Sequence, residues 1–262
     1  NRSCAIVFVK KHQKEYTIFM FQSIWMNVFY EPLYNALVFL TANVPWADVG
    51  LAVVALTIIV KIITFPLTQK SLRSQIKMRE IEPELEEIKG KYSNKEEQAR
   101  QTFALYKKHK INPLSGCLVL IIQLPILIAL YRVFYDGISL NENLLYSFVH
   151  YPETLNTLFI GLIDIAKKSI VLSVLAGITQ FIQIRLSMPA FKAKPDDKSF
   201  KTELMKSMNV QMRYVMPVFI VFIAYTTSGA IALYLVVNNL VSIAQEIFIK
   251  RKLQKEALVT VK

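Results

Sequence analysis

Cysteine and histidine are scarce in this chain. Its 262 residues include two cysteines, Cys4 and Cys117, and three histidines, His12, His109 and His150. The cysteines lie too far apart to suggest a disulfide framework, and the histidines have neither metal-ligand nor catalytic spacing. We therefore expect no metal site and no histidine-based catalytic centre.

Glycine and acidic residues are also few. None of the seven glycines belongs to a Walker-type phosphate loop, so the sequence predicts no nucleotide, no other cofactor and no enzymatic activity. The 19 acidic residues are outnumbered by 31 lysines and arginines, which gives a net charge of +12. Such a charge suits nucleic acid, anionic lipid or the ribosome, and the distribution of the charges must decide between them.

Apolar residues, by contrast, are abundant. They make up 53% of the chain, and the mean hydropathy of +0.36 is too high for an ordinary soluble domain. About 20 apolar residues are needed for a helix to cross a bilayer. Five segments approach this standard, and we expect membrane spans at 49–68, 114–135, 165–187, 212–227 and 229–249. The sequence predicts an all-α integral membrane protein with a five-helix transmembrane core.

The positive charges lie on one side of these spans. Lysine and arginine gather in 69–111, in a loop at 188–211 and in the tail at 250–262, whereas the loop at 136–164 carries Asp136, Glu142 and Glu153. Because cytosolic loops are enriched in positive charge, we expect a multi-pass protein with its N-terminus outside and its C-terminus in the cytosol. The tail at 250–262 either reflects this topology alone or also approaches anionic headgroups or ribosomal RNA, and we expect no specific DNA binding.

The N-terminal region allows two interpretations. We leave 1–28 undefined and expect 29–41 to form an amphipathic helix in the outer interface. The alternative is a sixth span over Thr17–Leu40. Cys4 is also open to interpretation as a lipidation site.

The charged stretch 69–111 is too polar for lipid and predicts a cytosolic helical hairpin. Its apolar residues recur at spacings of three and four, which predicts a seam between two helices. The seam consists of Met78, Ile81, Leu85 and Ile88. Ser93 and Glu96 have the spacing of a capping box that would begin the second arm. A solvated loop without structure is the alternative.

Lys61 is the most informative residue, because it lies within an apolar run. A central lysine costs roughly 2.5–3.5 kcal/mol on insertion scales and normally faces a water-filled cavity or a bundle interior. The alternative is a lysine close enough to the inner interface to extend its ammonium into water. Polar residues at helical spacing on four spans favour a hydrated groove around Lys61. The expected groove residues are Lys61, Thr57, Thr64, Gln123, Gln180, Gln183, Tyr234 and Asn238.

These motifs resemble the YidC/Oxa/Alb insertase family. The resemblance rests on four segments: Lys61-Ile-Ile-Thr-Phe-Pro-Leu-Thr68, Asn112-Pro-Leu-Ser-Gly-Cys117, Gln123-Leu-Pro-Ile126, and Ser228 through Asn239. It implies a five-helix core around a hydrophilic groove that opens to the cytosol and to lipid and is closed on the far side. Bacterial members usually carry arginine where this chain has Lys61, and some carry paired tyrosines where it has Tyr234 and Leu235. The large external domain of many relatives is also missing, which suggests a minimal member.

The resemblance implies an insertase that takes nascent membrane proteins into the groove and releases their apolar segments into lipid. Its implied partners are nascent membrane proteins and the lipid bilayer, with the ribosome and the Sec translocon as further candidates. The expected location is a bacterial inner membrane, with a mitochondrial or thylakoid membrane as the alternatives. A small transporter or channel is the main alternative, although we find no internal repeat in the sequence. An intramembrane protease and a structural scaffold are weaker alternatives.

Overall fold

The computed structural model describes residues 22–23, 25–44, 48–112, 115–135, 144–152, 154–188 and 206–260, except for some side chains within helices. The chain divides into two compact units. Unit 1 comprises Asn1–Thr57, Leu124–Gly177 and Phe219–Val236. Unit 2 comprises Ile58–Gln123, Ile178–Val218 and Val237–Lys262.

The described elements are almost all helical. In chain order they are η1 (Trp25–Tyr30), α2 (Glu31–Asn43), α3 (Val49–Glu80), α4 (Glu82–Lys91), α5 (Lys95–Lys108), α6 (Ser115–Tyr135), β1 (Leu158–Phe159), β2 (Ile163–Asp164), α7 (Ile170–Ser187), η4 (Gln211–Val215), α9 (Met216–Thr226) and α10 (Gly229–Thr260). The two strands pair antiparallel.

Four of the described helices are long and apolar enough to cross a membrane, which supports an all-α integral membrane protein. They are α3, α7, the helical segment Lys206–Thr226 and α10. Large apolar side chains cover their surfaces, as Ile63 on α3 and Val218 on α9 illustrate at 70% and 69% exposure. Such a surface suits lipid rather than water. The fifth expected span, 114–135, coincides with α6, whose described part Gln123–Val133 is a shorter apolar helix.

Several helices differ from the expected boundaries. Helix α3 does not stop near residue 68 but continues to Glu80, so its 32 residues extend about 48 Å, well beyond the hydrocarbon thickness. Helix α7 begins at Ile170 rather than at 165, because the preceding residues form β2 and a turn. Helix α10 continues through most of the basic tail to Thr260. Residues 29–41 fall within η1, which has no buried residue, and α2, which buries one face. Residues 17–21 of the alternative sixth span lie outside the described part of the chain.

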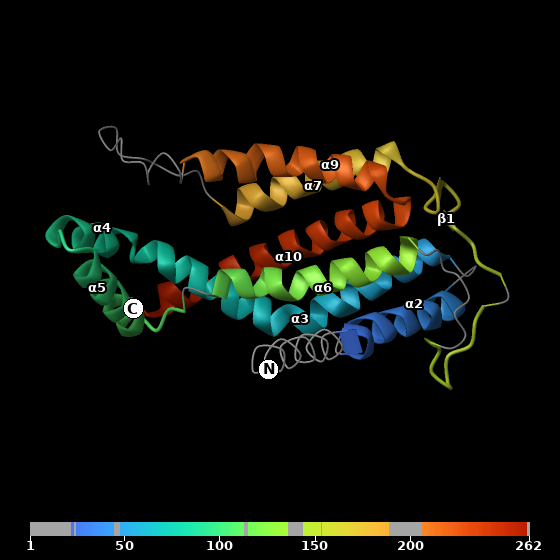
Figure 1. The fold of residues 1–262 in the computed structure, drawn as a ribbon, viewed down its shortest axis with the longest axis horizontal. Coiled ribbons are helices and arrows are strands. Elements are labelled where there is room, and N and C mark those ends of the chain that lie inside the picture. Colours follow the sequence, from blue (N-terminus) through green and yellow to red (C-terminus); the bar gives the residue numbers. More distant parts are fainter. Residues whose placement is uncertain are drawn as a thin grey trace, which may run out of the picture. The chain divides into compact units, whose positions relative to one another are not determined.

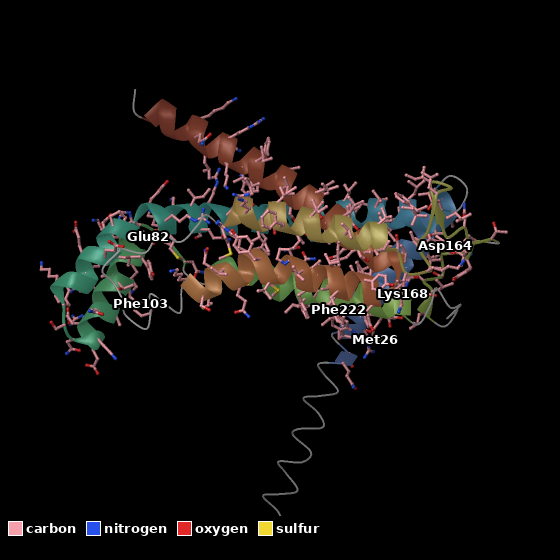
Figure 2. All side chains as sticks on the ribbon, turned by 90° about the horizontal axis from the view of Figure 1, so that it is seen from above. Met26, Glu82, Phe103, Asp164, Lys168 and Phe222 are labelled. Atoms are coloured by element: carbon pink, nitrogen blue, oxygen red, sulfur yellow. The ribbon has the colours of Figure 1, made fainter. Side chains whose placement is uncertain are left out.

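In unit 1, two buried polar side chains hold the segment 144–168 in place. Asn35 on α2 donates to the Leu144 carbonyl at 2.8 Å and accepts from the Tyr146 amide at 2.7 Å. Asp48, just before α3, accepts from the amides of Gly50 and Ile160. The described part of the expected outer loop, 144–152 and 154–164, is therefore tied to α2 and to the start of α3. Figure 2 labels Asp164 at its end and Lys168 shortly after it.

The turn before α10 also belongs to unit 1. Gly229 and Ala230 donate their amides to the carbonyls of Lys167 and Ile165 at 2.8 and 2.9 Å. A Cβ on Gly229 would lie 2.9 Å from the Lys167 oxygen and 3.0 Å from the Ile165 Cα. Only glycine fits this close approach of two backbones.

In unit 2, the charged helices α4 and α5 pack against each other around a small apolar core (Figure 1). Its buried members are Ile81, Leu105 and Ile111, and Met78, Leu85, Ile88 and Tyr106 pack around them. All four residues of the expected seam therefore meet in this core. Phe103 on α5 is instead 61% exposed (Figure 2).

The helix boundaries here follow local chemistry. Pro83 is the second residue of α4, where its missing N–H has no cost. The expected capping box on Ser93 is wrong, because Asn94 is the N-cap of α5 and its side chain accepts from the Glu96 amide at 2.9 Å. Asparagine is at least as good a cap as serine, so the helix begins one residue later than expected.

Candidate functional site

Lys61 lies on α3 in unit 2 and is partly buried. Its ammonium donates to the Ser242 hydroxyl of α10 at 2.9 Å, and that hydroxyl donates to the Asn238 carbonyl at 2.7 Å. The Gln245 amide donates in turn to the Lys61 carbonyl at 3.0 Å. Two polar side chains of α10, Ser242 and Gln245, thus contact one lysine of α3, and Ser242 in turn bonds to the Asn238 backbone.

This Lys61 cluster, made of Lys61, Asn238, Ser242 and Gln245, has unused hydrogen-bonding capacity. The Lys61 ammonium can donate three hydrogen bonds, and none of the described carboxylates lies within ion-pair distance of it. The side-chain oxygens of Asn238 and Gln245 are buried without a hydrogen-bond partner among the described residues. Buried acceptors of this kind are normally satisfied, so the cluster is suited to water or to a polar guest.

Helix α7 contributes a second polar row in unit 2. Gln180 and Gln183 lie 3.5 Å apart between Nε2 and Oε1, and Gln183 donates to the Ser187 hydroxyl at 3.0 Å. Thr179 accepts from Asn239 of α10 at 3.2 Å, and both are buried. This Thr179–Asn239 contact ties α7 to α10.

The other expected groove residues have different surroundings. Thr57 is buried in unit 1 and donates to the Val53 carbonyl of its own helix at 2.7 Å. Thr64, in unit 2, donates in the same way to the Val60 carbonyl at 2.8 Å. Tyr234 is buried in unit 1, and Gln123 is partly buried in unit 2. Within unit 2, the structure therefore joins the Lys61 side chain to α10, and Thr64 also contacts the Lys61 carbonyl at 3.4 Å.

Some residues of the site are absent from the expected set. Ser242, which binds Lys61, and Gln245 follow Asn238 at steps of four and three, so their helical spacing already indicates that they share a polar face, although the expected groove set omits them. Asn239 and Thr179 are buried, and the polarity of a residue in the sequence does not show whether it lies on a buried or an exposed face of its helix. Glu246 was missed as well, although an acidic residue at the end of an apolar helix is unusual.

Comparison with known proteins adds a second kind of observation. The sequence model of the family described as "60Kd inner membrane protein" matches residues 39–256. "Membrane protein insertase YidC" of Clostridium tetani is 37% identical over 211 residues, which cover 79% of this chain and 84% of that protein. The protein of the same name from Fusobacterium nucleatum is 34% identical over 230 residues, which cover 87% of this chain and 99% of that protein.

The chain belongs to the YidC family of membrane protein insertases.

Other members of the YidC family are much longer. The chain spans 33% of the relative from Anaeromyxobacter and 42% of the relatives from Rickettsia rickettsii. Among solved structures, "Active YidC insertase crystal structure with the first transmembrane domain resolved" matches with a TM-score of 0.50 at 22% identity. The match covers 91% of this chain and 52% of that one, and it supports the helical membrane fold. Family and helices together establish a multi-pass membrane protein.

Proposed function

We propose that this chain inserts nascent membrane proteins into a lipid bilayer from its cytosolic side. The observation that carries the proposal is the Lys61 ammonium, which lies in an apolar helix with a serine hydroxyl, and no described carboxylate, as its partner. Placing a lysine in an apolar membrane helix costs free energy. Its presence is best explained by a substrate that supplies the missing hydrogen-bond acceptors.

The Lys61 cluster suits the polar part of an entering chain. The ammonium can bind a carboxylate or a backbone carbonyl, and the free oxygens of Asn238 and Gln245 can accept backbone or side-chain N–H groups. Donors and acceptors on one face favour transient binding of many sequences, because every polypeptide backbone carries both groups. Thr57, Thr64, Gln123, Gln180, Gln183 and Tyr234 stay proposed groove residues.

Insertion by this route needs no covalent chemistry. Burial of the substrate's apolar segment in lipid provides the driving force. For an acidic segment that crosses outward, the membrane potential adds about 2.3 kcal/mol per charge per 100 mV. The proposal therefore includes no catalytic residue, no metal and no cofactor.

The surroundings of the site are also proposed from charge. We place the C-terminus and the α4–α5 pair in the cytosol of a bacterial cell, with the protein in the inner membrane and α2 in the outer interface. The basic end of α10 would then approach anionic headgroups or ribosomal RNA, and the Sec translocon is a further candidate partner.

The test is protease protection of a single-span substrate synthesised in the presence of proteoliposomes. We expect wild type and Lys61→Arg to protect the substrate and Lys61→Ala to protect several-fold less, because arginine keeps the charge. Lys70→Ala removes an exposed lysine of the same helix and serves as the matched control. Protection no better than with empty liposomes would contradict the proposal and favour a transporter. Protection that is indifferent to Lys61 would contradict the role of its charge.

A further inference from the structure

Unit 2 contains a buried carboxylate outside the Lys61 cluster. Glu246 on α10 is only 3% exposed, and its Oε1 lies 2.9 Å from Nζ of Lys250, four residues later. Its Oε2 accepts a hydrogen bond from the hydroxyl of Ser187, the last residue of α7. Glutamate is almost never buried without such partners, and a buried ion pair is seldom more stable than apolar residues of similar volume. The stability of the folded protein therefore gives little reason for the Glu246–Lys250 ion pair.

Two cations reach the same end of α7. Lys250 donates to the Leu186 carbonyl at 2.7 Å, and the Arg79 guanidinium of α3 donates to the Ser187 carbonyl. The last carbonyls of a helix lack partners within it, and the helix dipole favours cations there. Arg79, Ser187, Glu246 and Lys250 form a Glu246 cluster, in which the carboxylate pairs with Lys250 and both Glu246 and Arg79 bind Ser187.

The members of this cluster differ in accessibility. The Lys250 side chain is 29% exposed, whereas that of Glu246 is 3% exposed. A group that arrives from outside the protein therefore meets the ammonium before it meets the carboxylate. The cluster is also close to Lys61, because Ser242, which binds Lys61, lies about one helical turn before Glu246 on α10.

We propose that Glu246 is a resident counter-ion that competes with acidic side chains of the entering protein for Lys250, and so determines the charge selectivity of insertion. This inference rests on the proposed function, because it concerns the substrates of that function. While Glu246 is paired, an acidic side chain must displace it to reach Lys250. Without Glu246, the charge of Lys250 is open to acidic segments and repels basic ones.

The experiment compares two single-span substrates that share one apolar segment. One carries two aspartates in its N-terminal polar segment, and the other carries two asparagines at the same positions. Insertion of each is measured by protease protection with wild type, Glu246→Gln, Lys250→Gln and the double variant. Glu84→Gln, which removes an exposed carboxylate from α4, is the control for loss of a charge.

We expect Glu246→Gln to raise the ratio of acidic to neutral substrate inserted, on the order of tenfold for one charge acting over about 10 Å at an effective dielectric constant near 20. Lys250→Gln should lower the ratio, and the double variant should return it toward the wild-type value. Glu84→Gln should leave it unchanged. If Glu246→Gln does not accumulate, the double variant is compared with Lys250→Gln instead. A higher ratio of acidic to neutral substrate inserted by the double variant supports the proposal, and equal ratios overturn it.

Other results would overturn the inference in distinct ways. An unchanged ratio with equal loss of both substrates would show that the Glu246 cluster is only structural. If the effect of Glu246→Gln on insertion depended on the anionic-lipid content of the liposomes and were equal for both substrates, lipid headgroups would be the competing anions. If wild type inserts neither substrate, the proposed function itself fails, and this result is distinct from an unchanged ratio.

Discussion

Asp48 gives the most specific prediction for the outer segment of unit 1. Its Oδ1 accepts from the amides of Gly50 and Leu51 at 2.7 and 3.1 Å, which caps α3. Its Oδ2 accepts from the Ile160 amide at 2.8 Å. Ile160 has a φ of 53°, a left-handed conformation that costs a β-branched residue roughly 1–2 kcal/mol. One carboxylate thus begins a transmembrane helix and stabilises a strained turn.

Asp48→Asn separates these two roles. The asparagine oxygen can still cap α3, but its NH2 group would face the Ile160 N–H, and the lost hydrogen bond should cost about 1–3 kcal/mol. Asp48→Ala should cost roughly 2–5 kcal/mol, because the cap is lost as well. Ile160→Gly removes the left-handed strain at an exposed position, so it should restore about 1 kcal/mol in the Asp48→Asn background.

Amide hydrogen exchange of the protein in lipid nanodiscs provides the measurement. Asp48→Asn should increase exchange in the turn at 158–164 while the first turn of α3 stays protected. Asp48→Ala should increase exchange in both regions. If exchange at 158–164 were the same in wild type and Asp48→Asn, the Asp48–Ile160 contact would not hold this segment, and the reasoning would be refuted.

Three further predictions concern packing and pH. Gly229→Ala should destabilise the protein by roughly 1–3 kcal/mol in thermal unfolding, because a Cβ there meets backbone atoms. A Cβ on Gly90 in α4 would meet nothing within 4 Å, so Gly90→Ala should stabilise that helix by about 0.5–1 kcal/mol. Ile81→Ala should cost about 2–5 kcal/mol locally and make 82–108 sensitive to limited proteolysis; unchanged cleavage would contradict the apolar core of α4 and α5. Hydrogen bonds from Lys167 and Thr157 lower the pKa of Asp164 below its ordinary value of 3.8, so its stabilisation of the β1–β2 turn is complete above pH 3.8 and is lost as the pH falls through that lower pKa. Exchange in this turn should follow that pH dependence in wild type but not in Asp164→Asn.

The long apolar helices could be predicted from sequence, and Lys61 could be singled out within one of them, for the same reason. Lipid requires continuous apolar runs, and a charge inside such a run is costly enough to be conspicuous. The periodicity of Met78, Ile81, Leu85 and Ile88 was equally informative, because apolar residues at helical spacing in a charged stretch favour a face that packs against another helix. Both signals are dominated by the transfer of side chains out of water.

The partners of polar side chains could not be predicted in this way. Thr57 and Thr64 share a face with Lys61, yet each hydroxyl bonds to its own helix, an option that periodicity does not reveal. Asp48 is one acidic residue in a short loop, and only the folded chain brings Ile160 to it. Glu246 was hidden by the basic residues that follow it in the sequence. These contacts depend on how helices meet, and no local pattern encodes that.

The central claim is that the polar segment of a substrate passes beside Lys61 during insertion. The most direct measurement is disulfide crosslinking between a cysteine in that segment and Ser242→Cys, with Cys4 and Cys117 replaced by serine. Phe222 lies on the apolar surface of α9 and is 63% exposed, so Phe222→Cys is the matched control. The account predicts crosslinking at position 242 for the polar segment while insertion is in progress, and little at position 222. Crosslinking that favours position 222, or that never occurs at 242 although insertion succeeds, would contradict it.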